Sequence, residues 1–339
     1  MLLLLGLALL IAAARLPLPL QSQREAERWA GGSGKRYRQL TAILTPGQTL
    51  EQGDVYSFRT TAMDKITASD FEIPEGGSAL CDAWSVTGTL KVSGPRGSFD
   101  AAGIAVGGSF FDFHPMPVRS GSLLSDADVM HDRVVLDEQL AWMLYGSSDL
   151  AGQTVQIGQG DYFVAGVVAQ PDDHFTRAVS DRTPTVYLSY ESRSVLSGSG
   201  TASYEVVLPD PVKGFAKAIV ESAFASKGVV VENTDRFSFA SSLGRLRNLG
   251  TLGTRTTAVI FPSWENAAVA AETTCALLRG AAIVCLIWPA VLLIAALRLL
   301  ARAGIRRLKS GGRAAREALL DRRDERRMRI ISRGGSHSK

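Results

Sequence analysis

The chain of 339 residues is long enough for about two domains of ordinary size. Hydrophobic residues make up 46% and charged residues 21%, which is ordinary for a folded protein. Of the three cysteines, Cys275 borders a hydrophobic segment and Cys285 lies inside it, so Cys81 has no partner in the rest of the chain. The sequence therefore excludes an internal disulfide framework, and its four scattered histidines exclude a zinc motif of ordinary spacing.

The formal net charge of +4 hides an uneven distribution. The stretch from Arg298 to Lys339 contains fourteen Arg or Lys and four Asp or Glu, an excess of ten positive charges. The remaining chain, Met1–Leu297, is therefore acidic, at −6. An asymmetry of this size calls for a topological explanation.

The N-terminus reads MLLLLGLALLIAAA, followed by Arg15 and LPLPL. One interpretation is a short membrane helix that extends towards Leu20, with Arg15 reaching the outer interface. The other is a signal peptide cleaved after Ala12–Ala14, although no basic stretch precedes the apolar run. We favour a membrane anchor over residues 1–20, with a few cytoplasmic residues missing upstream if the start is mis-assigned. Both interpretations place Gln21 onward outside the cytoplasm.

The next segment, QSQREAERW, is typical of a helical stalk that leaves the membrane. Gly31–Arg36 then resembles a phosphate-binding loop, but the Walker pattern needs Gly five residues before the Gly-Lys pair and Ser or Thr after it. Those two positions hold Trp29 and Arg36. We therefore interpret Gly31–Arg36 as a linker and expect no nucleotide site in this chain.

Two β-α-β units flank a middle section. The first unit combines a strand at Tyr37–Leu44, a helix at Asp54–Ala68 and two strands, Ala83–Val92 and Phe99–Val106, joined by the turn SGPRG. The second combines four features: a strand at Tyr204–Leu208, a helix starting at Asp210-Pro211, a helix end at Lys227-Gly228 and a strand at Val229–Glu232. Two such units commonly pack into one α+β sandwich, here with the middle section inserted.

The middle section centres on a short helix, Glu138–Tyr145. Asp137 is a good N-cap residue, because its side chain can accept from the free N–H groups of the first turn. Gly146 suits the left-handed conformation that ends many helices. Strands are predicted at Gln153–Ile157, Tyr162–Val168 and Thr185–Tyr190.

The segment Gly280–Leu297 contains eighteen residues without a charge, between Arg279 and Arg298. At 1.5 Å per residue it spans roughly 27 Å, close to the ~30 Å hydrocarbon core of a bilayer. Pro289 is tolerated better in a membrane helix than in a soluble one. The segment predicts a transmembrane helix rather than a buried core helix.

Basic residues follow this segment at Arg302, Arg306, Arg307, Lys309, Arg313 and Arg316. Since Lys and Arg near a helix end are retained in the cytoplasm, the C-terminus is predicted inside and the residues before Arg279 outside. We interpret the tail mainly as this retention signal. Contact with anionic lipid or a cytoplasmic partner is the alternative, and nucleic acid is not favoured beside a membrane.

The stalk that enters the membrane reads FPSWENAAVAAETTCALLR. Its small residues form one face, which the N-terminal helix could approach closely: Ala267, Ala268, Ala271 and Cys275.

Residues 107–168 combine a Gly-x-x-Phe-Phe entry, an Arg/Gly pair, the run VVLDEQLAWMLYG, a Gly-x-x-Val hairpin and a Val-x-Gly-Val strand. These patterns lie at Phe110–Phe111, Arg119/Gly121, Val135–Gly146, Gly152–Val155 and Val164–Val167. In order and spacing the stretch resembles the MacB-like periplasmic core domain of ABC transporter permeases of the MacB/FtsX type. The resemblance covers roughly Tyr37–Asn233 with its flanking helices.

This resemblance implies an α+β core, made of repeated β-α-β units and an inserted β-rich subdomain, between two transmembrane helices. The predicted domains are a transmembrane helix or signal anchor at 1–20, an extracytoplasmic core at 21–262, a stalk helix at 263–279, a second transmembrane helix at 280–300 and a basic cytoplasmic tail at 301–339. The protein is expected to be a multi-pass protein of the cell membrane with both termini in the cytoplasm.

The resemblance also implies a membrane component of an ABC-type transport or mechanotransmission system. A separate ATP-binding subunit would hydrolyse ATP, and the extracytoplasmic domain would transmit the motion. The family has two further membrane helices, which are absent here. We therefore expect a truncated relative, or a chain that needs an additional permease subunit or a second copy of itself.

Two other functions were weighed. A membrane-anchored sensor or binding module without an ATPase fits the same topology. An extracytoplasmic enzyme would use Asp172, Asp173 and His174, or Asp126 and Asp128 with His131. Neither set comes with a nucleophile motif or a second ligand cluster, so we expect no catalytic, cofactor or metal site.

Overall fold

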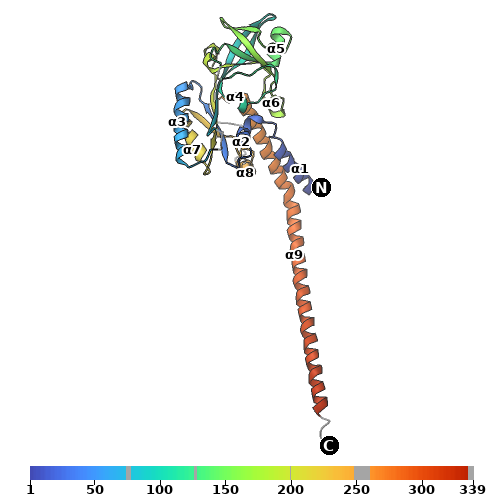
Figure 1. Cartoon of the computed structure of the whole chain (residues 1–339). Helices are drawn as coiled ribbons and strands as arrows, with labels where there is room; N and C mark the ends of the chain where they lie inside the picture. Colours follow the sequence, from blue (N-terminus) through green and yellow to red (C-terminus); the bar gives the residue numbers. More distant parts are fainter. Residues whose placement is uncertain (74–77, 126–127, 199, 248–259, 335–339) are drawn as a thin grey trace. The chain divides into compact units, whose positions relative to one another are not determined.

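The computed structural model describes residues 1–73, 78–125, 128–198, 200–247 and 260–334 (Figure 1). It divides into two compact units, one formed by Ile11–Arg279 and the other by Met1–Leu10 with Gly280–Lys339. The larger unit contains the mixed α+β core that the sequence predicts.

One ten-stranded mixed sheet runs through the whole core, in the order β10-β1-β9-β2-β3-β8-β5-β7-β4, with β6 paired to β2 and β7. The strands are β1 (Tyr37–Leu44), β2 (Cys81–Gly94), β3 (Gly97–Gly108), β4 (Val118–Gly121), β5 (Arg133–Asp137), β6 (Thr154–Ile157), β7 (Gly160–Val168), β8 (Thr185–Ser189), β9 (Ala202–Pro209) and β10 (Gly228–Glu232). Sequence patterns missed only the short strands β4 and β5 among these.

The helices of the core are η1 (Gln21–Gln23), α2 (Glu25–Ala30), α3 (Gln52–Ala68), α4 (Phe110–Phe113), α5 (Glu138–Tyr145), α6 (His174–Val179), η2 (Tyr190–Val195), α7 (Phe215–Phe224) and α8 (Phe239–Arg247). Helices α3 and α7 lie side by side on one face of the sheet (Figure 1). Their apolar residues and the inner residues of β1 and β9 form one hydrophobic core, with Phe58, Tyr204 and Phe224 in mutual ring contact. The two β-α-β units thus pack together as predicted.

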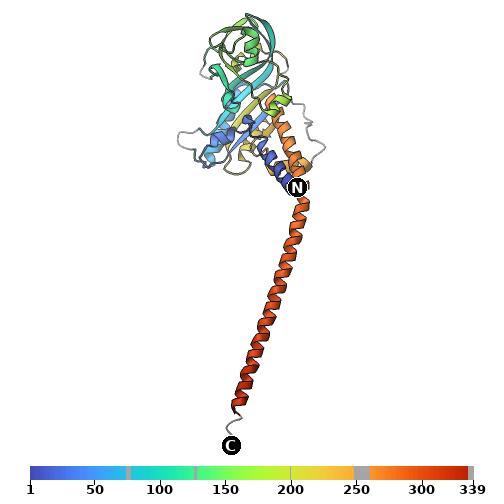
Figure 2. The same cartoon turned by 90° about the vertical axis from the view of Figure 1, so that its right-hand side faces the viewer.

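The long β2–β3 hairpin extends into the β-rich part, so one continuous sheet joins the two parts of the core. In β2, residues Cys81–Val86 pair with β9, whereas Val92 and Ser93 pair with β6. A second hydrophobic core, around α5, fills this end of the sheet. This end lies away from α8 within the core (Figures 1 and 2).

The predicted start of α7 at Asp210-Pro211 is wrong, because the helix begins at Phe215 after Gly214, whose φ is 92°. Asp210 is fully buried and pairs with Arg38 at 3.2 Å. Its other carboxylate oxygen accepts from the N–H of Ala216 at 3.2 Å, so it still supports the first turn, but from further upstream. A buried ion pair that decides where a chain turns leaves no local sequence pattern.

Helix α5 is confirmed, including both of its ends. The Asp137 carboxylate accepts from the N–H of Leu140 at 2.6 Å, and Gly146 takes the left-handed conformation with φ 75°. The same carboxylate also accepts from the N–H of Thr185 at 2.8 Å and from Gln170 at 2.7 Å. The buried Asp137 carboxylate therefore connects the start of α5 to the start of β8 through hydrogen bonds.

Burial raises the pKa of Asp137 to about 6, against the lowering effect of its hydrogen bonds. The folded chain then binds this proton more tightly than the unfolded chain, so its contribution to stability falls as pH rises from about 4 through about 6. The variant Asp137→Asn keeps the cap but cannot titrate. We expect the unfolding free energy of the natural chain, relative to this variant, to fall by about 2–3 kcal/mol between pH 4 and 7. Unfolding in detergent at several pH values measures it, and a flat difference would contradict it.

The smaller unit contains the apolar parts of α1 (Leu2–Arg15) and α9 (Ser263–Gly334). Helix α9 is long and apolar enough to cross a membrane between Ser263 and Ile305, and only 6% of its most apolar window is buried. That exposure argues against a core helix. Helix α1 is shorter, with fourteen residues, and it ends at Arg15 instead of continuing towards Leu20.

Helices α1 and α9 approach each other closely at Gly6. A Cβ atom added at Gly6 would lie 2.7 Å from Leu286 Cγ and 3.4 Å from the carbonyl oxygen of Ala282. A small residue is therefore required at this position, as is common where membrane helices pack.

Replacing Gly6 by Leu should lower the thermal stability of the chain in detergent, because the side chain forces the two helices apart. The matched control is Gly304→Leu, at a helical glycine with nothing within 4 Å. Since Gly costs roughly 1 kcal/mol in a helix interior, the control should be unchanged or slightly stabilised. Equal melting temperatures for the two variants would contradict the contact.

Candidate functional site

The part of α9 that precedes the apolar segment, Ser263–Arg279, carries charged residues at a regular interval. Glu265, Glu272 and Arg279 are seven residues apart, which is close to two helical turns, so they share one face. All three are buried. Between them lie small residues that are fully buried: Ala267, Ala268, Ala271, Cys275 and Ala276. The stalk thus packs against the core with a face that is both small and charged.

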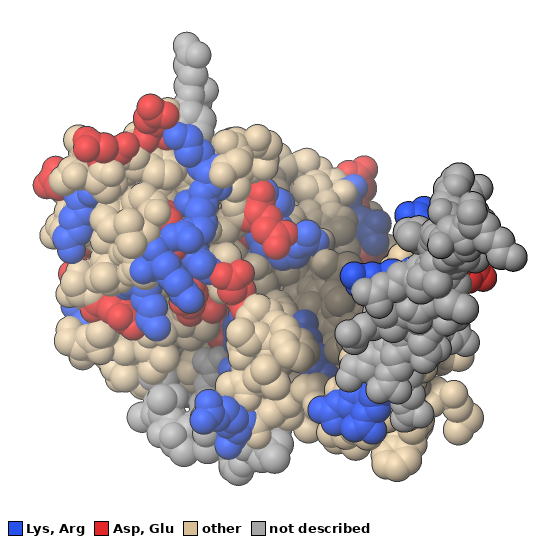
Figure 3. All heavy atoms as spheres, turned by 90° about the horizontal axis from the view of Figure 1, so that it is seen from below, with Lys and Arg blue, Asp and Glu red and all other residues tan. Residues whose placement is uncertain are grey.

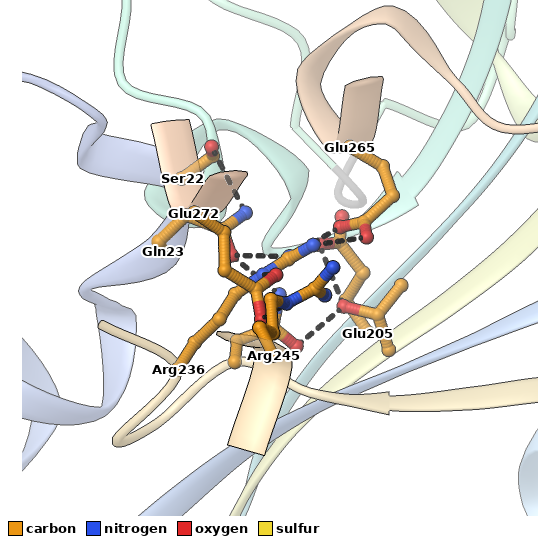
Figure 4. A network of polar contacts seen from close by, with 9 residues as sticks. Ser22, Gln23, Glu205, Arg236, Arg245, Glu265 and Glu272 are labelled. Carbon is orange, nitrogen blue, oxygen red and sulfur yellow. Dashed lines mark hydrogen bonds and ion pairs between the residues drawn. The ribbon is translucent and has the colours of Figure 1, made fainter. Parts of the chain in front are cut away.

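Arg236 is the central partner of this face (Figure 4). It lies between β10 and α8, just after Asp235, whose φ is 60°. Its Nη1 and Nη2 atoms donate to the two carboxylate oxygens of Glu265, both at 2.8 Å, and its Nε donates to Glu272 at 2.8 Å. Arg245 of α8 donates to the other oxygen of Glu272. The guanidinium of Arg236 therefore binds two carboxylates that lie about two helical turns apart on the stalk.

The cluster is enclosed and balanced in charge. The side chains of Arg236, Glu265 and Glu272 are only 3%, 1% and 6% exposed. Burial alone would lower the pKa of Arg236, but the two carboxylates outweigh burial and raise it above its ordinary value. The guanidinium thus keeps its charge throughout the physiological range.

The segment that leads from α1 into the core reaches the same cluster. Gln23 of η1 accepts from Arg236 Nη1 at 3.1 Å and from Asn233 Nδ2 at 2.9 Å through one side-chain oxygen. Gln39 of β1 holds the neighbouring backbone, since it donates to the carbonyl of Ser22 at 2.7 Å and accepts from the N–H of Glu25 at 2.9 Å. The segment that follows α1 and the stalk that precedes the apolar part of α9 therefore both bond to Arg236.

A chain of buried polar groups continues from this place across the sheet (Figure 4). The Thr41 hydroxyl lies 3.0 Å from Asn233 Oδ1 and 3.4 Å from Glu205 Oε1, and Glu205 Oε2 lies 2.5 Å from His114 Nε2. The His114 ring packs on Trp264 of the stalk, with the ring centroids 4.7 Å apart. The chain of contacts thus starts and ends on α9.

The predicted small-residue face of the stalk does meet the end of α1. The Cys275 thiol donates to the carbonyl oxygen of Ala13 at 3.4 Å, and both residues are fully buried. Alanine packing of this kind tolerates a shift along the helix axis, because one methyl group resembles the next. The charged cluster does not tolerate such a shift, because sliding α9 by one turn, about 5.4 Å, would leave buried charges unpaired.

The arrangement pairs the charges of the stalk with partners on neighbouring segments. A buried ion pair contributes little net stability compared with apolar residues of the same shape, but it can specify one register among several. The site joins the stalk to η1, to the turn after β10 and to α8, and all of its charges are paired in this one register. We call the cluster formed by Gln23, Arg236, Arg245, Glu265 and Glu272 the stalk junction.

The candidate residues of the first enzyme hypothesis have structural partners. Asp173 caps α6, since its carboxylate accepts from the N–H groups of Phe175 at 3.0 Å and Thr176 at 2.9 Å. Asp172 pairs with Arg177 at the surface, and the His174 ring contacts Phe175. These contacts explain the three residues without chemistry.

The second set is not brought together as a site either. Asp128 pairs with Arg133 at 3.3 Å, and His131 Nδ1 lies 3.0 Å from the Ser189 hydroxyl. Asp126 lies outside the described residues. Within the part of the chain that the structure describes, no group of three or more His, Cys, Asp or Glu could hold a metal ion.

Basic and acidic side chains lie next to one another on the face of the core that Figure 3 draws. The basic side chains form a short band on this face, and acidic side chains border it.

Comparison with known families identifies the core. A family model described as the MacB-like periplasmic core domain matches residues 33–221, just over half of the chain. The chain belongs to this family. The MacB-like core therefore makes this a membrane-associated protein with an extracytoplasmic domain of the kind found in ABC transporter permeases. The resemblance predicted from the motifs of residues 107–168 is confirmed.

Solved structures of the same kind are similar at low sequence identity. The periplasmic region of MacB from Actinobacillus actinomycetemcomitans is 18% identical, with a TM-score of 0.40, covering 62% of this chain and 92% of that one. The extracellular domain of the noncanonic ABC-type transporter YknZ from Gram-positive bacteria is 12% identical, with a TM-score of 0.38, covering 58% and 99%. A search among curated proteins finds no match.

The motif residues of the MacB-like core have packing roles. Phe110 is buried against Trp264 of the stalk, at 6.0 Å between ring centroids, and Arg119 pairs with Glu138 of α5. Gly121 has φ 72°, and a Cβ there would lie 2.1 Å from the carbonyl oxygen of Ala165, so only glycine fits. The motifs identify the scaffold, whereas all five residues of the stalk junction lie outside them.

The stalk junction is not among the sites predicted from the sequence. The seven-residue spacing of Glu265, Glu272 and Arg279 was a readable signal, because acids on an otherwise apolar helix face require partners. The local sequence does not mark Arg236 as their partner, because it lies in a turn that follows a strand.

Replacing Arg236 by Ala should cost about 3–5 kcal/mol of unfolding free energy, because it leaves two buried carboxylates without their counter-ion. Arg236→Lys should recover only part of this loss, since an ammonium cannot reach both carboxylates with a planar fork. The matched control, Lys217→Ala, removes the exposed Lys217–Glu221 pair and should cost about 0.5 kcal/mol or less. Denaturant or thermal unfolding measures all three, and equal costs at positions 236 and 217 would refute the assignment.

Proposed function

We propose that the chain is the membrane component of an ABC-type transport or mechanotransmission system. In this proposal a separate cytoplasmic ATP-binding subunit drives motion of the membrane helices, and the MacB-like core converts that motion into work outside the cytoplasm. The stalk junction is the observation that carries the proposal, because it fixes α9 and the segment after α1 to one sheet through buried charges.

The proposed topology has two membrane helices, α1 (Leu2–Arg15) within the segment 1–20 and a second at 280–300, with the core between them outside and a basic cytoplasmic tail at 301–339. The apolar composition of α9 and the packing of α1 on it at Gly6 support two neighbouring helices. The excess of positive charge after Arg298 supports a cytoplasmic C-terminus. The protein would then be a multi-pass protein of the cell membrane.

The proposed partners follow from what the chain contains. The segment Gly31–Arg36 lacks the Walker pattern, so ATP hydrolysis is assigned to another subunit. An additional permease subunit or a second copy of the chain would complete the membrane part, and lipids surround it. We propose no catalytic residue, cofactor or nucleic-acid partner for the chain itself.

A second candidate function is a membrane-anchored sensor or binding module that works without an ATPase. A cavity of about 420 Å³ in the core favours it, with walls that include Ile104, Phe110, His114, Gln170, Tyr187 and Trp264. Because Trp264 and His114 also belong to the polar chain beside the stalk, an occupant of this cavity could bias the stalk directly.

Purification of the tagged chain from its own membranes in mild detergent should separate the two functions. Under the first, an ATP-hydrolysing subunit co-purifies in stable ratio, and the complex hydrolyses ATP. Arg236→Ala should leave this subunit bound, since the junction lies outside the cytoplasm, but should abolish the cellular function. Lys217→Ala should preserve both.

Failure to recover any ATPase, together with full cellular function of the chain expressed alone, would refute the first function and favour the sensor. Loss of the ATPase from Arg236→Ala, with an intact complex for Lys217→Ala, would instead mean that the junction supports assembly rather than transmission.

A further inference from the structure

Helix α8 presents its side chains the opposite way from a helix that faces water. Its exposed residues are Phe239, Ala240, Leu243, Gly244 and Arg247, which fall on one helix face. The two large apolar side chains on this face, Phe239 and Leu243, are 48% and 39% exposed. A helix in water normally turns such residues towards the core.

Two polar residues of α8, Ser242 and Arg245, bond to the stalk. Ser242 is buried and accepts from Arg279, and Arg245 donates to Glu272 of the stalk junction. The orientation of α8 is therefore fixed by buried hydrogen bonds, and it cannot roll to hide Phe239 and Leu243 without breaking them.

Arg279, the last residue before the apolar segment in the sequence, also holds the start of α8. Its guanidinium donates to the carbonyl oxygens of Phe237 and Ser238, both at 2.7 Å, immediately before α8 begins. The next residue, Gly280, starts the uncharged apolar segment. The start of α8 is thus fastened to the last residue outside the hydrocarbon core in the proposed topology.

We propose that α8 is an interfacial helix, with Phe239 and Leu243 inserted into the headgroup region of the extracytoplasmic lipid leaflet. Apolar faces of such helices enter the headgroup and acyl boundary by about 5–10 Å. Arg247, on the same face at the end of the helix, suits the phosphate groups at that depth. The proposal rests on the two-helix topology, since it takes Arg279 as the edge of the bilayer.

This contact attaches the stalk junction to the lipid surface as well as to the core. Because Arg245 and Ser242 connect α8 to α9, a membrane-bound α8 would hold the junction at a constant height above the bilayer. Axial movement of α9 would then act against the lipid surface as well as the core.

Depth-dependent fluorescence quenching tests the proposal on the full chain in vesicles of phosphatidylcholine and phosphatidylglycerol. Cys285 is replaced by Ala, and one thiol is introduced by Leu243→Cys or, independently, Phe239→Cys. Cys81 and Cys275 are buried and stay unlabelled. Each thiol carries an environment-sensitive dye, and the quencher is phosphatidylcholine spin-labelled near its headgroup.

Two labelled controls separate the inference from the topology. Trp142→Cys lies on α5, away from α8, and Val284→Cys lies in the apolar segment. We expect a loss of fluorescence at positions 239 and 243 with the shallow quencher, a loss at 284 with a deep quencher, and none at 142.

Quenching at 284 but not at 239 or 243 would overturn the interfacial helix and leave the topology intact. No quenching at 284 would overturn the topology and the inference with it. Cross-linking of two chains through Leu243→Cys, or protection of this thiol from both lipid and aqueous quenchers, would assign the face to a second copy or to the chain itself and would also overturn the inference.

Discussion

The rest of the structure depends on one buried interaction, the guanidinium of Arg236 between Glu265 and Glu272. Three desolvated charges are costly to bury, and they are tolerated because the fork of Arg236 satisfies one carboxylate with two hydrogen bonds and the other with a third. Since apolar residues of similar volume would stabilise the fold as well, the value of the cluster lies in specificity. It allows a helix with a repetitive alanine face only one position along its axis.

The sheet connects the region of the junction with the far end of the core. The strands next to the junction, β1 and β9, carry the buried Thr41 and Glu205, and the long β2–β3 hairpin continues the same sheet into the α5 end of the core. Hydrogen-bonded strands and close-packed cores have low compressibility, so a displacement at one end is passed on rather than absorbed. This is the physical property that the proposed transmission of motion requires.

Prediction from sequence was accurate wherever the signal was local. The helix Glu138–Tyr145 with its cap at Asp137 and stop at Gly146, the β2–β3 turn and most strand positions follow from side-chain periodicity and turn chemistry within a few residues. The start of α7 was missed because Asp210 is held by Arg38, a residue far away in sequence. Strands β4 and β5 were missed because short strands of mixed character are decided by their neighbours in the sheet. The spacing of the acids in the stalk indicates buried charges that need a partner. The sequence does not indicate that this partner is Arg236.

By itself the sequence determined the class of the protein: an acidic α+β core of the MacB-like family, an apolar segment long enough to span a bilayer, and a basic tail. These are properties of composition, period and motif, which a linear chain displays directly. Only the tertiary structure decided that Arg236 and Arg245 meet the stalk at Glu265 and Glu272 and that Gln23 bonds to Arg236. It also decided that α8 turns its apolar side outward. Such pairings join residues that are distant in sequence, and their energy comes from burial and geometry that exist only after the chain has folded.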